Sequence, residues 1–163
     1  MGVSVVNALS EWCEVHVHRD GKIYYQAYDR GVPRKDVSII GATEQTGTVV
    51  TFKADPEIFE VEDFSFDTLS NRLRELAFLN KGIRIAIVDN RLPTPKSHDF
   101  MFEGGLREFV QFLNKNKSAI HKEPIYFEAN REEVEMEMAL IYNDTYNETL
   151  FSFVNNINTR EGG

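Results

Sequence analysis

The chain has 163 residues, of which 42% are hydrophobic and 12% aromatic, enough to build one ordinary domain or parts of two. This composition excludes an intrinsically disordered chain, and the formal net charge of -8 argues against a free-standing nucleic-acid module, which is usually basic. The single cysteine, Cys13, excludes an internal disulfide. No apolar run reaches membrane-span length and no signal peptide is evident, so we expect a cytoplasmic location.

The first third of the chain predicts a short helix followed by an antiparallel sheet. Residues 2–10 are expected to form the helix. Strands are expected where apolar and polar residues alternate, at residues 12–19, 22–29, 37–40 and 46–53. Asp20-Gly21 between the first two is a two-residue hairpin signal. In the first strand, Cys13, Val15 and Val17 share one face.

The middle of the chain predicts a helix and a second hairpin. The helix is expected to begin at a cap provided by Ser65 or Asp67 and to end near Asn80. Its predicted apolar stripe consists of Leu69, Leu73, Leu76 and Ala77. Strands are expected over residues 83–89 and 98–102, on either side of a proline-containing turn.

The last third opens at a predicted hinge, Glu103-Gly104-Gly105. An amphipathic helix should follow, because its apolar residues are spaced at i, i+3, i+4 and i+7: Leu106, Phe109, Val110 and Leu113. A polar loop over residues 114–124 leads to three expected strands. These strands are placed at residues 125–129, 134–142 and 149–155.

Two residue types on the first strand invite a chemical interpretation. His16 and His18 share a strand face and could touch one metal ion, but no second cluster of ligands has suitable spacing, so a solvated strand face is favoured. Cys13 lies on the opposite, apolar face. A buried structural thiol is favoured over a nucleophile there.

Charged residues gather at two other places. The acidic cluster comprises Glu132, Glu133, Glu135 and Glu137. Its alternation along a strand favours a solvated face over catalysis or metal binding. Lys115, Lys117 and Lys122 form a small basic loop that could meet a phosphate or a neighbouring subunit, although such loops mostly serve solubility.

No complete phosphate-binding, dinucleotide-binding, metalloprotease or serine-hydrolase motif is present in the sequence. From residue spacing alone, the chain is an acidic α/β piece with an antiparallel sheet. A non-enzymatic binding or scaffolding module therefore stays open as an alternative function.

Short stretches in a fixed order along the chain carry a family resemblance. They are residues 2–10 (GVSVVNALS), 46–50 (TGTVV), 72–80 (RLRELAFLN), 103–105 (EGG), 114–117 (NKNK), 120–121 (IH) and 155–163 (NNINTREGG). Each is weak alone, but the ordered set resembles the B subunits of bacterial DNA gyrase across essentially the whole chain. The B-type subunit of topoisomerase IV is a close variant of the same plan.

The resemblance implies an α+β fold in two parts. Residues 1–102 would be the C-terminal part of a GHKL (Bergerat-type) ATPase domain, with helices packed on a mixed, mostly antiparallel sheet. Residues 103–163 would be the N-terminal part of a transducer domain with an S5-like α/β fold. The chain is then expected to be a fragment that runs from the end of the ATP lid into the transducer.

The resemblance also implies ATP-binding residues. Gly2 and Val3 match the end of the lid that wraps the triphosphate. Thr48 matches a threonine that helps to hold adenine, and Val50 would add apolar wall. Arg19 matches an arginine at the pocket rim, where aminocoumarin-type inhibitors bind. Without the resemblance, Thr48 would be interpreted as a β-branched residue that favours strands.

No catalytic residue and no metal ligand is assigned to this chain. The family's catalytic glutamate, magnesium-binding asparagine, adenine-reading aspartate and γ-phosphate lysine match no position here. The parent would use ATP and Mg²⁺, pair with gyrase A and a second gyrase B protomer, and act on DNA through that complex. The fragment alone is expected neither to hydrolyse ATP nor to bind it tightly.

Overall fold

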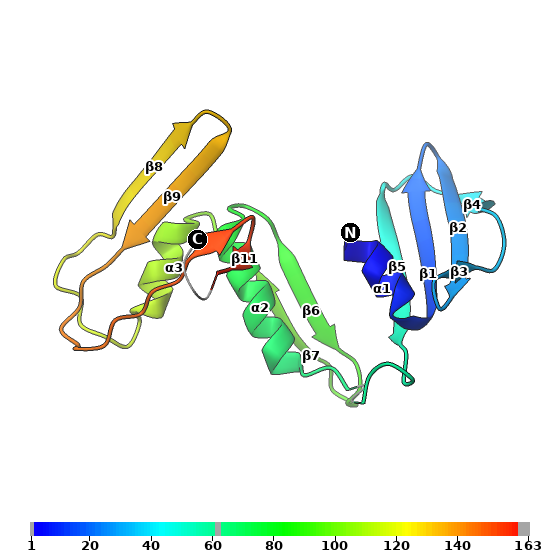
Figure 1. Cartoon of the computed structure of the whole chain (residues 1–163), viewed down its shortest axis with the longest axis horizontal. Helices are drawn as coiled ribbons and strands as arrows, with labels where there is room; N and C mark the ends of the chain where they lie inside the picture. The colour runs from blue at the N-terminus through cyan, green and yellow to red at the C-terminus, as the bar shows by residue number, and fades with distance from the viewer. Residues whose placement is uncertain (1, 61–62, 160–163) are drawn as a thin grey trace. The chain divides into compact units, whose positions relative to one another are not determined.

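The computed structural model describes residues 2–60 and 63–159, in which helices accompany antiparallel sheets (Figure 1). The chain forms two compact units, Met1–Phe64 and Ser65–Gly163. The α+β fold predicted from the sequence is confirmed. The predicted domain boundary after residue 102 stays a prediction.

The first unit is a sheet with one short helix. Its elements are α1 (Gly2–Ala8), β1 (Ser10–Arg19), β2 (Lys22–Asp29), β3 (Val32–Pro33), β4 (Ser38–Ala42) and β5 (Gly47–Ala54). The strand order is β3-β2-β1-β5, and β4 also pairs with β2. Asp20 and Gly21 have φ of 53° and 73°, the left-handed values that a two-residue hairpin of this kind requires. The predicted helix and strands of this region are confirmed.

The β1 strand is central, so its side chains have neighbours on both sides. Cys13 stands opposite Tyr28 of β2 and Phe52 of β5, and it is fully buried. A β-bulge lies between Ser10 and Trp12, where the register to β5 shifts. The alternation from Cys13 onward therefore places one apolar row on the face that carries Phe52.

An ion pair joins the end of the β2–β3 turn to the end of β5. Asp55 is 1% exposed, and the Nε of Arg30 donates to its Oδ2 at 2.6 Å. Arg30 also contacts Glu57, with 2.7 Å between Nη2 and Oε1. The Arg30 guanidinium and the backbone N–H of Glu57 hold the pKa of Asp55 below its usual value. This clamp ties residues far apart in the sequence.

The second unit combines helices with short hairpins. Its elements are α2 (Phe66–Leu79), β6 (Ile85–Asp89), β7 (Lys96–Phe100), α3 (Leu106–Leu113), β8 (Ile125–Arg131), β9 (Val134–Leu140), β10 (Phe153–Val154) and β11 (Ile157–Asn158). The strands pair as β6 with β7, β8 with β9, and β10 with β11. Ser65 caps α2 by accepting a hydrogen bond from the Thr68 N–H, and Asn80 ends the helix, as predicted.

The buried face of α2 only partly matches the predicted apolar stripe, of which Ala77 is fully buried. Leu69, a member of that stripe, is 40% exposed. The buried residues of α2 are Phe66, Ser70, Ala77 and Phe78. The physical reason is the position of the aromatic partners. Phe78 stacks on Phe102 with 3.6 Å between ring centroids, and on Phe109 of α3 at 5.0 Å, so the helix turns Phe78 inward.

The predicted strand over residues 149–155 is largely wrong. Only Phe153 and Val154 are in a strand, paired with Ile157 and Asn158. The reason lies in the next two residues: Asn155 and Asn156 have φ of 50° and 65°, which turns the chain back at once.

This turn docks on the end of α2. Arg72 donates to the Asn156 carbonyl at 2.6 Å, and the Asn156 side chain donates to Asn80 at 3.0 Å. The final part of the NNINTREGG stretch, residues 160–163, lies outside the described residues. No helix in the described part of the chain is both long and apolar enough to cross a membrane.

Candidate nucleotide-binding face

The register between β1 and β5 defines the face that carries the predicted ATP-binding residues. Val15 stands opposite Val50, and Val17 opposite Thr48. Because direct partners point to the same side, Thr48 and Val50 share a face with the apolar row of β1. Thr48 is exposed and Val50 half-buried. Gly47, just before Thr48, has φ of 148°, a conformation that favours glycine.

The predicted lid residues lie in the first turn of α1. Gly2 is exposed, and Val3 is 58% exposed. Among residues 2–60 and 63–159, no hydrogen bond or ring contact joins them to Thr48 or Val50. The structure therefore places Thr48 and Val50 on one face, and the place of Gly2 and Val3 in the ATP site stays a prediction.

Arg19 lies at the far end of the same face, where β1 enters the hairpin turn. It pairs with Lys22, and its Nε is 3.4 Å from the Asp20 carboxylate. Both side chains are 76% exposed. An exposed guanidinium at the open end of the row is compatible with its predicted place at a rim.

The other end of this face adjoins an apolar hollow of about 280 Å³. It is lined by Val5, Val6, Leu9, Ser10, Phe52, Ala54, Phe59, Asp63 and Phe64. Phe52 and Phe64 meet edge to face with 6.3 Å between ring centroids. The face thus changes along β5 from apolar at Phe52 to polar at Thr48.

The opposite face of the sheet carries the histidines. His16 lies 4.8 Å from the ring of Tyr25, and His18 Nδ1 is 3.2 Å from the Thr43 hydroxyl. In the described part of the chain, no group of three or more His, Cys, Asp or Glu residues could hold a metal ion. Both histidines are half-buried. Burial raises the pKa of Cys13, which fits a structural thiol.

The acidic cluster lies on the β8–β9 hairpin and its turn. Glu132, Glu133, Glu135 and Glu137 are all exposed. The Tyr126 hydroxyl donates to Glu128 at 2.9 Å and to Glu137 at 3.3 Å. The Glu128 carboxylate, together with desolvation and the Glu137 charge, raises the pKa of Tyr126 to about 12. The cluster is a solvated face, as expected.

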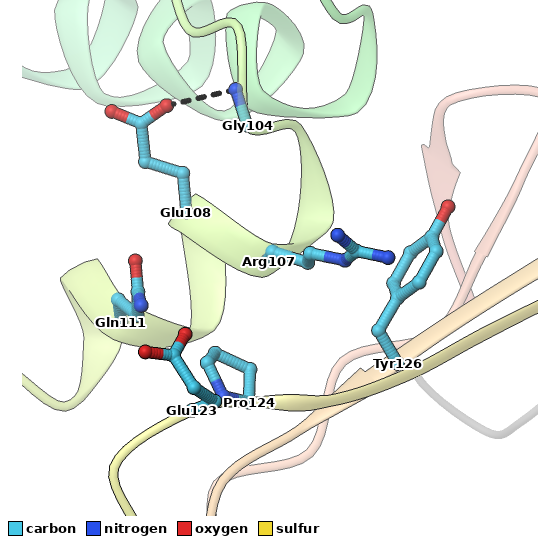
Figure 2. Close-up of a pocket in the computed structure, with 7 residues that line it drawn as sticks. All are labelled: Gly104, Arg107, Glu108, Gln111, Glu123, Pro124 and Tyr126. Atoms are coloured by element: carbon cyan, nitrogen blue, oxygen red, sulfur yellow. Dashed lines mark hydrogen bonds between the residues drawn. The ribbon is translucent and has the colours of Figure 1, made fainter.

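A polar groove of about 620 Å³ lies between α3 and the start of β8. Its lining residues are Gly104, Arg107, Glu108, Gln111, Glu123, Pro124 and Tyr126. Figure 2 shows Arg107 reaching from α3 toward the ring of Tyr126, and the guanidinium carbon lies 4.1 Å from the ring centroid. Glu108 turns back and accepts a hydrogen bond from the Gly104 N–H at 3.1 Å. With charges of both signs, the groove favours neither a simple anion nor a simple cation.

Comparison with known proteins gives the family. The family model for DNA gyrase B matches residues 105–163. The DNA gyrase B protein of Bacillus mycoides is 51% identical over all of this chain, which spans 40% of that relative. The DNA gyrase B protein of Clostridium acetobutylicum is 53% identical over all of the chain, which spans 25% of it. This chain belongs to the DNA gyrase B family.

Solved gyrase B structures share the fold. The 43K ATPase domain of Thermus thermophilus gyrase B, in complex with an aminocoumarin, matches 99% of this chain with a TM-score of 0.89 and 36% identity. The gyrase B structure from Myxococcus xanthus matches 96% with a TM-score of 0.87 and 26% identity. The chain covers 44% and 46% of those two chains. It therefore spans less than half the length of these gyrase B relatives.

Sequence reasoning missed two features of this gyrase B chain. The Arg30–Asp55 clamp joins residues 25 positions apart, and no local pattern marked it. A lone aspartate at the end of an apolar strand was the only available signal. The groove beside Arg107 was also missed, because its lining comes from a helix and a loop that only the fold brings together.

Proposed function

We propose that this chain is part of the ATPase subunit of a DNA gyrase, a type IIA topoisomerase that uses ATP to introduce negative supercoils into DNA. The observation that carries the proposal is the likeness to gyrase B relatives over the whole chain, at about half of all positions. The match of 99% of the chain to a gyrase B ATPase domain supports the same activity. In the cell, the protein would work in the cytoplasm with gyrase A and a second gyrase B protomer.

Within that protein, the β1–β5 face would form one wall of the ATP site. The Thr48 hydroxyl can donate and accept hydrogen bonds, so it would hold the adenine edge directly or through a water. Val50 lies one side chain further along the same face and would exclude water from the base. Arg19 would mark the open rim, and Gly2 and Val3 the end of the lid.

The described residues fit the base better than they fit the phosphates. They offer an apolar row with one hydroxyl, but no group of three or more possible metal ligands. Bound Mg²⁺ would supply charge neutralisation for the triphosphate, and its ligands would come from elsewhere in the full-length protein. Hydrolysis also requires a base and a γ-phosphate lysine that match no position here. The 163-residue chain alone would therefore neither turn over ATP nor bind it tightly.

The test uses the full-length protein with its A-type partner and relaxed plasmid DNA. Negative supercoiling that depends on ATP is the expected result. Decatenation without supercoiling would instead assign the chain to topoisomerase IV. The absence of any ATP-dependent change in DNA topology would contradict the proposal.

Thr48→Val tests the wall itself, because valine keeps the strand shape and removes the hydroxyl. We expect ATP affinity to fall about tenfold, the usual effect of losing one good polar contact. Val49→Thr, on the opposite face of β5, is the matched control and should leave affinity unchanged. Equal affinities of Thr48→Val and the unmodified protein would remove Thr48 from the site.

A further inference from the structure

One further apolar side chain lies beside the proposed adenine wall. Val15 of β1 is the direct cross-strand partner of Val50. Such partners have Cβ atoms about 4.5–5.5 Å apart on the same side of the sheet. A purine is wider than this separation. A flat base that lies against Val50 therefore also lies against Val15.

The neighbours of Val15 close the floor on two sides. Toward α1, Cys13 is 0% exposed and fills the face. On the β2 side, Val15 stands opposite Gln26, whose amide is already engaged. The Gln26 Nε2 donates to the Lys35 carbonyl at 3.1 Å, and the Tyr28 hydroxyl donates to its Oε1 at 2.7 Å. Val15 thus lies half-buried between a buried thiol and a fixed amide.

In the other direction, the face runs toward the turn between β1 and β2. The next side chain of β1 on this side is Val17, opposite the exposed Thr48, and the one after it is the exposed Arg19. A ligand that enters from the Arg19 end meets the Arg19 guanidinium, then Val17 and the Thr48 hydroxyl, and then Val15 and Val50.

We infer that Val15 is a specificity-determining residue that forms the floor of the base site together with Val50. The inference rests on the proposed ATP-binding function. An apolar floor acts by removing the flat base from water and makes no contact with phosphates. Loss of the apolar floor should therefore weaken the binding of ligands that carry a base. It should leave the binding of a triphosphate without a base unchanged.

Calorimetry on the full-length protein tests this with two probes, ATP and inorganic tripolyphosphate. Val15→Thr keeps the β-branched shape and places a hydroxyl in the floor. We expect ATP to bind about five- to tenfold more weakly, as expected when an apolar contact becomes polar. Tripolyphosphate should bind as it does to the unmodified protein. Val15→Leu restores an apolar floor and should bind ATP more tightly than Val15→Thr.

The controls separate this inference from the proposed function. Val49→Thr makes the same chemical change on the opposite face and should alter neither probe. If Val50→Thr weakens ATP binding while Val15→Thr does not, the inference about Val15 fails and the proposed function stands. If Val15→Thr weakens the binding of ATP and of tripolyphosphate equally, the inference about Val15 also fails, because that pattern indicates a general disturbance of the fold. If the unmodified protein binds no ATP, the proposed function itself fails.

Discussion

The β1–β2 and β8–β9 hairpins share one local plan but have different surroundings. Both are antiparallel pairs joined by two residues, at Asp20-Gly21 and Glu132-Glu133. Both alternate apolar and polar residues. In the first hairpin, β5 adds a third strand and Cys13 is fully buried. In the second, the described residues from Val134 to Met138 are all exposed. Alternation predicts a strand, whereas burial depends on what else packs against it.

The second hairpin depends on α3 and the aromatic core behind it. Phe78 is 1% exposed and contacts the rings of Phe102, Phe109 and Phe112. Phe78→Ala should cost the second unit about 3–5 kcal/mol, because it removes a large side chain from a closed core. Hydrogen exchange in the full-length protein should then rise across α2, α3 and β9, and stay unchanged across β1 and β2.

Leu69→Ala is the matched control for that experiment. Leu69 was predicted to lie in the apolar stripe but is 40% exposed, so its loss should cost less than about 1 kcal/mol. A cost equal to that of Phe78→Ala would contradict the buried face described for α2.

The first hairpin depends instead on the Arg30–Asp55 clamp. Asp55→Asn should lower the melting temperature of the first unit by about 5 °C, because the paired carboxylate is lost. Since the folded-state pKa of Asp55 is lowered, its contribution is present above the ordinary value of 3.8 and is lost as pH falls through the lower folded value. The difference between the two proteins should therefore shrink below about pH 3.8. A constant difference down to about pH 2 would contradict the ion pair.

A histidine ties the base of the second hairpin to the preceding loop. The Tyr142 N–H donates to His121 Nε2 at 2.9 Å, so Nδ1 carries the proton and donates to the Glu123 carbonyl at 2.7 Å. His121→Phe keeps a ring but loses both bonds, and should cost about 1 kcal/mol in urea unfolding. The His16 ring has no hydrogen bond among the described residues, so His16→Asn should lower the free energy of unfolding by less. The reverse order would remove this role from His121.

The smallest effect concerns the tip of the second hairpin. Glu132 has φ of 58°, which is strained for a residue with a long side chain. The matching residue of the first hairpin, Asp20, has φ of 53°, which its short polar side chain tolerates better. Glu132→Gly should stabilise the hairpin by about 0.5 kcal/mol. This is the backbone strain that glycine relieves, reduced by the larger conformational entropy that glycine loses on folding. Glu133→Gly, where φ is not positive, should destabilise it. Slower hydrogen exchange of β8 and β9 in the first variant alone would confirm the difference.

The sequence by itself determined the elements that depend on near neighbours. Period-two alternation predicted β1, β2 and β5, Asp20-Gly21 predicted the turn, and Ser65 predicted the start of α2. It also carried the family resemblance, which relatives about half identical over the whole chain support. These features depend on residues a few positions apart.

Tertiary structure alone decided which faces are buried and which distant residues meet. It turned Phe78 rather than Leu69 inward, paired Arg30 with Asp55, and docked the Asn156 turn on Asn80. It also set Val15 beside Val50, through the strand register. The physical reason is that these contacts form between segments brought together by packing, and their energy depends on a partner that local periodicity does not encode.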